Sequence, residues 1–406
     1  MIYQTASRLF FATSFVLVMA GCASNDVEEN APAELLDFTA ERELQSVWSR
    51  SVGDGQGEED YLRLTPAIAG DKIFAASSEG EVRAFNKADG DSLWDIEIDD
   101  DSTLIGGVGI SGDLVLVTTT SGQLIALDSA TGEQRWRATL PSEVIAPAAG
   151  DGSVIAVHTN NGQIIGFNHT DGNKIWSYSN SVPALTLRGS SGPVFYKEVV
   201  IATFANGKLA VLDKATGSLR WEARVGVPDG TTELERLVDV DANPLIDKDV
   251  LYAVGYQGRI VAVNPENGRL AWFNAASSHV NMAVSYDNIY VVGSKGSVTA
   301  FALNGDGVRW EQTAFTNREL SGVAALDSVV VVGDFEGYLH VLSQQDGHIV
   351  ARHQVDDEGV RVAPLVDGDL LYVFANSGDL VAYRLAESGS TFNMDFHPVD
   401  WLKDLF

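Results

Sequence analysis

Apolar and polar residues alternate over short segments along most of the chain, and each segment ends at a turn. In residues 80–94 (GEVRAFNKADGDSLW), a Gly precedes the alternating residues, and then come Asn86, a turn that contains Gly90, and a Trp. Alternation with a period of two residues predicts a β-strand. The Asn side chain caps the turn and the Gly supplies a positive φ angle, so the segment predicts a hairpin whose second strand ends on Trp.

This segment is repeated along the chain. Further copies are residues 122–136, 162–176, 207–221, 258–272 and 296–310, then 337–351 with Ala in place of Trp, and an eighth that begins at Gly378 without a Trp end. The starts recur at roughly 40 residues, a period typical of β-propellers. The large apolar side chain of Trp suits packing between neighbouring sheets.

A second hairpin precedes each copy. Residues 66–77, 244–254 and 364–374 each place a turn with Gly or Asp between two apolar strands. Two successive hairpins make a four-stranded meander. The sequence therefore predicts an all-β fold, an eight-bladed β-propeller of four-stranded antiparallel blades.

The eighth blade lacks its last strand. An isolated strand that ends on Trp, residues 44–48 (LQSVW), lies near the N-terminus, and we expect it to complete the blade that begins at Gly378. A ring closed by the N-terminal strand has no free sheet edge. Residues 44–385 are thus expected to form the propeller. Residues 386–406 are expected to be a loosely docked C-terminal tail, with an added partner contact as the alternative.

The first segment is typical of a secretory signal. Arg8 precedes the apolar run of residues 9–20, which is too short for a membrane-spanning helix. Met19, Ala20 and Gly21 precede Cys22 as in a bacterial lipobox. Residues 1–21 are expected to be a lipoprotein signal peptide; the alternative is a plain signal peptide with an incidental cysteine.

Lipidation would make Cys22 the first residue of the mature protein. Several acyl chains anchor a protein stably where one does not. Ala23, in place of the Asp that retains lipoproteins at the inner membrane, points to the outer membrane. Residues 22–43 are acidic and polar, and we expect an extended tether.

Composition narrows the classes of partner. The chain has 406 residues, of which 45% are hydrophobic, and a formal net charge of −29. This charge argues against binding of nucleic acid or anionic lipid headgroups through the body, and it fits a solvated acidic surface equally well. Cys22 is the only cysteine, which excludes an intrachain disulfide.

Two segments resemble ligand-binding motifs, but neither has the complete pattern. Residues 107–112 (GVGISG) match the glycine pattern of a nucleotide site, but strands are expected on both sides instead of a following helix. Residues 239–243 (DVDAN) have calcium-loop spacing, but Pro244 and Val250 stand where Gly and Glu are needed. The seven histidines are expected at the surface or at sheet edges. We therefore predict no catalytic residue, metal site or cofactor.

Two connections between blades are longer than the others. Gly162 and Gly207 are 45 residues apart, and Gly207 and Gly258 are 51 apart. The extra residues lie in 177–193 and 222–244, which neighbouring blades place side by side on one face. Long loops on a rigid ring are where a partner site is expected.

The composition of these connections suits a protein interface. Leu185 and Leu187 precede Arg188, and apolar anchors beside an Arg are typical of energetic centres. Asp239 and Asp241 offer carboxylates to a basic partner. Alternatively, the leucines hold the loop on its blade and Arg188 pairs with the two aspartates.

The lipobox, the acidic tether, the eight repeats and the two long connections together resemble the BamB family, outer-membrane lipoproteins of the β-barrel assembly machinery. The most specific segments are PALTLRG and TELERLVDVD, which lie outside the repeat. The resemblance implies a non-catalytic scaffold facing the periplasm, which binds the POTRA region of BamA and assists the insertion of barrel proteins, with possible contact to their unfolded precursors. The family's contact residues match Leu185, Leu187, Arg188, Asp239 and Asp241.

The repeat alone also resembles the propellers of quinone-dependent dehydrogenases. Such an enzyme needs convergent polar groups, and usually calcium, at the centre of the ring. A periplasmic quinone-dependent dehydrogenase is therefore the alternative function.

Overall fold

The computed structural model describes residues 30–56, 62–98, 103–187, 189–227, 231–232 and 234–389. The chain divides into the units Met1–Ala31 and Pro32–Phe406, and the account below concerns the second unit. The predicted signal peptide, Cys22, Arg188 and the tail from residue 390 onward lie outside the described residues. Within the described residues, no helix is long and apolar enough to cross a membrane.

Every regular element of the described residues is a β-strand, which confirms the predicted all-β class. The strands of the first half are β1 (Arg42–Ser51), β2 (Ala67–Ala69), β3 (Lys72–Ala76), β4 (Glu81–Asn86), β5 (Ser92–Glu97), β6 (Gly109–Ser111), β7 (Leu114–Thr118), β8 (Gln123–Asp128), β9 (Gln134–Thr139), β10 (Ala149–Gly150), β11 (Val154–Thr159), β12 (Gln163–Asn168), β13 (Lys174–Ser179), β14 (Val194–Tyr196), β15 (Val199–Thr203) and β16 (Lys208–Asp213). Those of the second half are β17 (Leu219–Arg224), β18 (Leu245–Asp247), β19 (Val250–Val254), β20 (Gly258–Val263), β21 (Leu270–Ala276), β22 (Ala283–Ser285), β23 (Asn288–Val292), β24 (Val298–Ala302), β25 (Val308–Gln312), β26 (Ala324–Leu326), β27 (Val329–Gly333), β28 (Tyr338–Ser343), β29 (Ile349–Gln354), β30 (Leu365–Asp367), β31 (Leu370–Phe374) and β32 (Asp379–Glu387).

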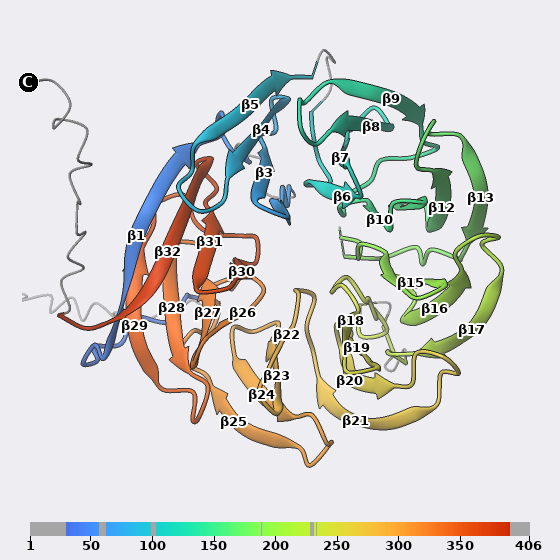
Figure 1. Ribbon diagram of the computed structural model, residues 1–406. Helices are drawn as coiled ribbons and strands as arrows, with labels where there is room; N and C mark the ends of the chain where they lie inside the picture. The colour runs from blue at the N-terminus through green and yellow to red at the C-terminus, as the bar shows by residue number, and fades with distance from the viewer. Residues whose placement is uncertain are drawn as a thin grey trace, which may run out of the picture. The chain divides into compact units, whose positions relative to one another are not determined.

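Consecutive strands pair antiparallel in groups of four, as in the sheets β2-β3-β4-β5 and β26-β27-β28-β29. Figure 1 shows the sheets of this unit side by side around a circle, with the short first strands toward the centre and the last strands at the rim. Neighbouring first strands are in contact, for example β2 with β6 and β22 with β26. Buried apolar side chains fill the space between adjacent sheets.

The glycine motif of residues 107–112 lies on an inner strand. It spans β6 and the turn to β7, and no helix follows, in agreement with the rejection of a nucleotide site. A Cβ on Gly109 would lie 1.9 Å from the carbonyl oxygen of Ala148, so the glycine allows two inner strands to approach closely. Here β6 pairs with β10 through Ile110 and Ala149, which joins two groups of four into one sheet of eight strands.

The N-terminal strand lies in the last sheet. β1 pairs antiparallel with β32, and the order of this sheet is β1-β32-β31-β30. The second half of the expected tether is docked within the second unit. Residues 32–41 contact the sheet β26–β29, and β1 already begins at Arg42. β32 ends at Glu387, two residues beyond the predicted end of the propeller.

A Trp on the last strand of a group of four bonds to a turn of the next group of four strands. The Trp136 Nε1–H group donates to the carbonyl oxygen of His169 over 2.9 Å. Gly172 has a φ of +69°, and a Cβ at this position would lie 2.4 Å from the Trp136 ring. The turn therefore requires glycine both for its backbone conformation and for its contact with the ring. The Nε1–H groups of six further Trp residues donate in the same way to a backbone oxygen of the next sheet. They are Trp48, Trp94, Trp176, Trp221, Trp272 and Trp310.

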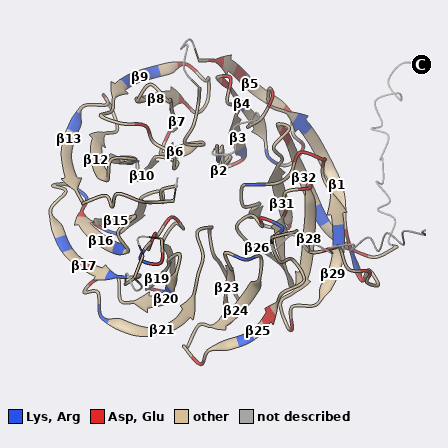
Figure 2. Cartoon of the chain, turned by 180° about the vertical axis from the view of Figure 1, so that it is seen from behind, with Lys and Arg blue, Asp and Glu red and all other residues tan. Residues whose placement is uncertain are grey.

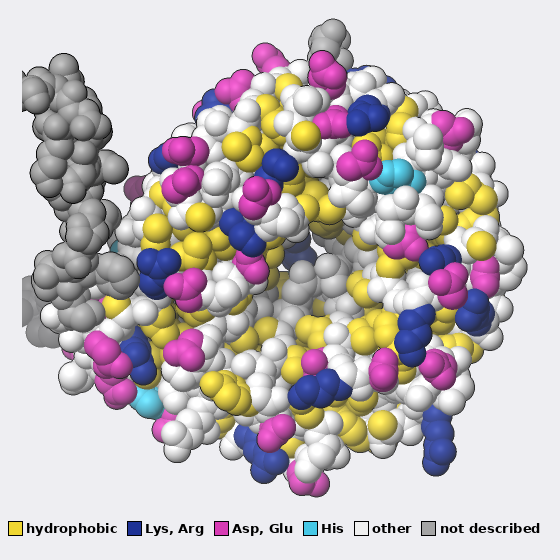
Figure 3. All heavy atoms as spheres, in the orientation of Figure 1, with side chains coloured by type: hydrophobic (Ala, Val, Ile, Leu, Met, Phe, Trp, Pro, Cys, Tyr) yellow, Lys and Arg dark blue, Asp and Glu magenta, His cyan; other side chains and the backbone are white. Residues whose placement is uncertain are grey.

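Five of the described turns between third and fourth strands are also held by their own Asp or Asn, as the sequence predicts, at residues 86, 128, 168, 213 and 264. The Asp128 Oδ1 atom accepts hydrogen bonds from the backbone N–H groups of Ala130, over 2.8 Å, and Thr131, over 3.0 Å. Its Oδ2 atom pairs with Arg135 on β9, and Asp213 pairs with Arg220 on β17 in the same way. Basic residues accordingly recur on the outer strands β9, β13 and β17 (Figure 2). Acidic and basic side chains are interspersed on the face drawn in Figure 3, which is hollowed at its centre.

Candidate functional site

The strands of every sheet have two different ends. Antiparallel order places the turns between first and second strands, and between third and fourth strands, at one end, here called the turn end. The loops between second and third strands, and the connections from one sheet to the next, lie at the other end, here called the loop end. Both long connections lie at the loop end: residues 180–193 join β13 to β14, and residues 225–244 join β17 to β18.

Residues 239–243 hold the first connection in place. The backbone N–H of Leu187 donates to Asp239 Oδ2 over 3.0 Å, and the N–H of Gly192 donates to Asn243 Oδ1 over 2.6 Å. Between these two bonds, a Cβ on Gly189 would lie 2.4 Å from Asp241 Oδ2. The spacing that resembles a calcium loop therefore has a structural use, since alternate polar side chains face the neighbouring loop.

The two aspartates are buried, which corrects the expectation that they offer carboxylates to a partner. Asp239 is 0% exposed and Asp241 is 6% exposed. The Asp239 Oδ1 atom is buried and has no hydrogen-bond partner among the described residues. Burial raises the pKa of Asp239 from 3.8 to about 6. Burial, and then the charge of Asp239, raise the pKa of Asp241 well above its ordinary value, while Arg63 opposes this rise. The pair therefore acts within the chain, as a support for the loop.

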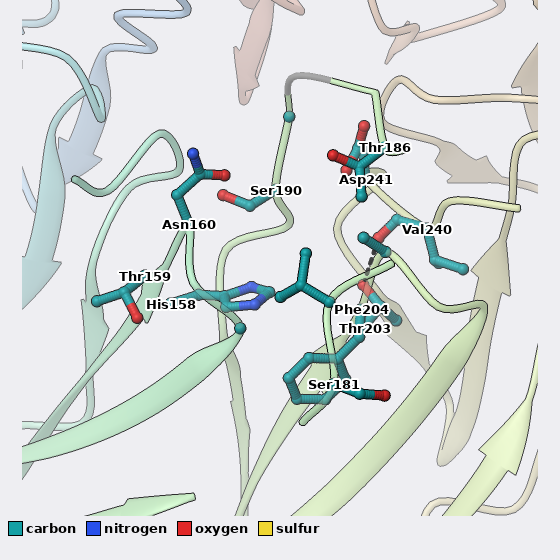
Figure 4. A pocket seen from close by; sticks show the side chains of 14 residues that line it. His158, Thr159, Asn160, Ser181, Thr186, Ser190, Thr203, Phe204, Val240 and Asp241 are labelled. Atoms are coloured by element: carbon teal, nitrogen blue, oxygen red, sulfur yellow. Dashed lines mark hydrogen bonds between the residues drawn. The ribbon is translucent and has the colours of Figure 1, made fainter. Parts of the chain in front are cut away.

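A narrow pocket lies under the first connection (Figure 4). It has about 20 Å³ available to the centre of a water molecule, room for about one water. Figure 4 shows Thr186 next to Asp241 and the ring of His158 directed into the pocket. The His158 Nδ1–H group donates to the carbonyl oxygen of Ser191 over 3.0 Å, and Thr203 Oγ1 donates to that of Val240 over 2.9 Å. The pocket is too small for a cofactor.

The expectation that histidines lie at the surface or at sheet edges is wrong for two of them. His158 and His340 are buried, and burial lowers the pKa of His158 to about 4. Both rings are held in hydrogen bonds, His158 to Ser191 and His340 to Asp334. Each ring has one nitrogen in a polar contact that the sequence does not reveal, while His340 Nδ1 is buried without a partner among the described residues.

The first connection presents apolar side chains at its tip. Leu185 is 44% exposed, and Val182 is also exposed, whereas Leu187 is half-buried next to the aspartates. The structure thus brings Leu187, Asp239 and Asp241 together and leaves Leu185 free to meet a partner. Isolated exposed leucines are common, but here they lie on a loop fixed from below by buried polar groups.

The second connection presents an exposed leucine, Leu234, on an ordered turn that was not predicted from the sequence. Glu235 accepts hydrogen bonds from the backbone N–H groups of Thr231, over 2.7 Å, and Thr232, over 3.0 Å. The Glu235 N–H in turn donates to Thr232 Oγ1 over 3.1 Å, which is the reciprocal pattern of a capping box. This turn places Leu234 at 66% exposure, and Leu237 behind it is buried. The Thr-x-x-Glu spacing of residues 232–235 was the signal that could have predicted an ordered turn here.

At the loop end, Arg63 lies next to this region. Burial lowers the pKa of Arg63, and the negative charge of Asp241 opposes this change. Its Nη1 atom donates to the carbonyl oxygen of His279 over 3.5 Å, a long contact. Within the described ranges, no group of three or more His, Cys, Asp or Glu residues is placed to hold a metal ion.

Comparison with known proteins gives a consistent result. Residues 78–312 and 294–392 match the family described as outer membrane protein assembly factor BamB. The protein of that description from Pseudomonas aeruginosa is 46% identical over 372 residues, which cover 92% of this chain and 97% of the relative. The crystal structure of BamB from Moraxella catarrhalis is 29% identical and superposes with a TM-score of 0.77, covering 84% of this chain and 99% of that one. A quinohemoprotein alcohol dehydrogenase from Comamonas testosteroni superposes with a TM-score of 0.66 over 84% of this chain and 76% of its own, but at 14% identity this likeness shows the fold alone.

Proposed function

Because the chain belongs to the BamB family of outer membrane protein assembly factors, we propose that it is a non-catalytic scaffold of the outer-membrane protein assembly complex. It binds the periplasmic POTRA region of a BamA-like barrel protein and assists the insertion of β-barrel proteins. Family membership over more than nine-tenths of the chain supports the role in assembly. The partner surface is the tip of the two long connections at the loop end.

The loop end suits this role because it combines exposed apolar groups with a rigid base. Leu185 and Leu234 are the anchors, and burial of each in a partner would stabilise a complex by about 1–3 kcal/mol. Leu187, Asp239 and Asp241 hold the first anchor in position through the bond from the Leu187 N–H group. Arg188 completes the set as a charged contact that fixes the orientation of the partner.

The scaffold itself is an eight-bladed β-propeller whose ring is closed by the N-terminal strand. The order β1-β32-β31-β30 supports closure, since the first strand of the chain completes the sheet of the last three. The eight-stranded sheet counts as two blades joined by the single pair of Ile110 and Ala149. The ring spans about residues 42–387, after a signal peptide and a tether, and before a C-terminal tail.

The protein is anchored to the outer membrane through Cys22 and faces the periplasm. The lipobox of residues 19–22 supports this anchor, and Ala23 supports the outer membrane as its site. Acidic body charge disfavours adsorption of the ring on anionic headgroups, so the acyl chains supply the attachment.

A matched pair of leucine variants tests the partner surface. Leu185 and Leu219 are both 44% exposed, but Leu185 is at the loop end and Leu219 is on the outer strand β17. Tagged wild-type protein, Leu185→Glu and Leu219→Glu are purified from detergent-solubilised envelopes, and the barrel protein that co-purifies is quantified. We expect wild type and Leu219→Glu to retrieve it and Leu185→Glu to retrieve at least about tenfold less.

Each outcome of this experiment has a separate meaning. If wild type retrieves no barrel protein, the scaffold function is wrong. If all three proteins retrieve it equally, the function stands and the position of the surface is wrong.

A further inference from the structure

The segment before the first strand, residues 32–41, lies against the sheet β26–β29 and is here called the N-terminal strap. At its beginning, the Ala33 N–H group donates to the carbonyl oxygen of Thr316 over 2.9 Å. The Arg318 Nη1 atom donates to the carbonyl oxygen of Ala33 over 3.0 Å. Thr316 and Arg318 belong to the connection between β25 and β26, so the strap begins at the loop end.

Arg318 is a buried side chain that holds the beginning of the strap in place. Its side chain is 3% exposed and its Nε atom donates to Asp334 Oδ2, which is fully buried, over 2.7 Å. His340 contacts the same carboxylate oxygen over 2.8 Å, and Glu336 pairs with the guanidinium from the solvent side. A buried guanidinium held by two carboxylates has one fixed orientation, so the carbonyl of Ala33 is bound at a defined point.

The rest of the strap follows β29 toward the turn end. Arg352 donates to the carbonyl oxygen of Leu36 over 3.0 Å and lies over the Phe38 ring, 5.1 Å from its centre. The Glu41 N–H group donates to the carbonyl oxygen of Val350 over 2.9 Å, and the Glu41 carboxylate meets His348 over 3.2 Å. Because His348 follows the turn between β28 and β29, the strap ends at the turn end.

The strap occupies a junction that differs from the other junctions described. The repeat of residues 337–351 ends on Ala351, and the neighbouring sheet has β1 in place of a continuous third-to-fourth strand turn. β1 is in contact with β29, and the strap leads directly into β1, as Figure 1 shows for these two outer strands. The chain thus runs from the loop end to the turn end as the strap and returns as β1.

From this path we infer that the strap fixes the exit of the tether at the loop end, the same end of the strands as the proposed partner surface. The inference rests on the proposed function for the anchor at Cys22 and for the partner surface. Pro32 follows Cys22 by ten residues, so the anchor is at most about 35 Å from the start of the strap, whatever its conformation. If the strap were undocked, the same anchor would gain ten more residues of reach and could serve either end.

A spin label on Cys22 tests this inference directly, because Cys22 is the only cysteine of the chain. The unlipidated mature protein carries the label, and its effect on amide signals is compared between loops 293–297 and 334–337 at the loop end and turns 304–307 and 344–347 at the turn end. In wild type we expect signal loss at the loop end at least about threefold greater than at the turn end. The triple variant Phe38→Ser/Arg318→Met/Arg352→Ala, which also removes the bond to the Ala33 carbonyl, should bring this ratio close to one. Arg220→Ala, which removes an arginine from outer strand β17, should leave it unchanged.

Hydrogen exchange of the wild-type protein tests the docking without a variant. The amides of Ala33 and Glu41 should exchange at least about tenfold more slowly than in a peptide of the same sequence. Equal signal loss at both ends in wild type, or exchange at the rate of the peptide, would overturn the inference. Binding of the soluble wild-type protein to the POTRA region is measured separately; its failure would remove the proposed function and leave the docked strap standing.

Discussion

The turn end and the loop end differ in whether their residues recur from sheet to sheet. At the turn end, the same Asp or Asn, Gly and Trp recur from sheet to sheet, and each Trp bonds to the next turn, as Trp136 does to His169. At the loop end, the long connections share no repeat, and their exposed leucines are supported by a buried carboxyl pair and a capped turn. The repeated end therefore joins neighbouring groups of strands, and the unrepeated end is where we propose the partner surface.

The largest effect is expected from a substitution at the turn end. Trp136→Ala removes a buried ring and its hydrogen bond to the next group of four strands, and should lower the free energy of unfolding by about 3–5 kcal/mol. Urea denaturation measures this loss. Partner binding per folded molecule should not change, because the residue is at the far end from the connections; a loss of binding in fully folded protein would contradict the separation of roles.

The next largest effect is expected from a substitution at the loop end, which should weaken partner binding without changing stability. Leu234→Glu places a charge on a side chain that is 66% exposed, so the free energy of unfolding should stay within about 0.5 kcal/mol of wild type. Binding of the POTRA region, measured by calorimetry, should weaken at least about tenfold. Leu270→Glu on the outer strand β21 is the control and should bind like wild type.

The carboxyl pair couples the loop end to pH. The pKa of Asp239 is raised from 3.8 to about 6, so the folded state binds more protons than the unfolded state between these values. Its contribution to stability is therefore complete below about pH 3.8 and is lost as the pH rises through about 6. Wild type should lose about 1 kcal/mol of stability from this group between about pH 5 and about pH 7.5.

A pair of variants isolates this pH dependence. Asp239→Asn keeps an acceptor for the Leu187 N–H group but does not titrate, so its melting temperature should depend less on pH. Asp213→Asn is the control: the pKa of Asp213 is lowered to about 2, mainly by Arg220, so its titration lies below this range. An unchanged pH dependence in Asp239→Asn would show that Asp239 is not the group that titrates in this range.

The smallest effect concerns the strap at the turn end. The hydrogen bond that His348 donates to Asp346, and then the one that it donates to Glu41, raise the pKa of His348. The charged contact with Glu41 is therefore present at low pH and is lost as the pH rises through the raised pKa. His348→Ala should accelerate exchange of the Glu41 amide by no more than about threefold, since exposed ion pairs contribute little. A much larger change would mean that His348 carries the docking that we assign to Arg318 and Arg352.

The sequence predicts the strands better than it predicts the site. Alternation and the recurring Gly–Trp segments locate the hairpins, and the unpaired strand around Trp48 is found with β32. The burial of Asp239 and Asp241 could not be predicted, because a carboxylate in a loop shows neither its orientation nor its neighbours. The strap was missed for a related reason: residues 32–41 have no periodicity, and single contacts from Arg318 and Arg352, distant in sequence, hold them.

Site-specific photocrosslinking in living cells tests the central claim most directly. A photoreactive amino acid is placed at Leu185 or Leu234 at the loop end, and at Leu219 or Leu270 on the outer strands. The account predicts that the two loop-end positions crosslink to the barrel protein of the assembly complex and that the two outer-strand positions do not. Crosslinks from the outer strands alone would contradict it and would place the partner surface on the rim of the ring.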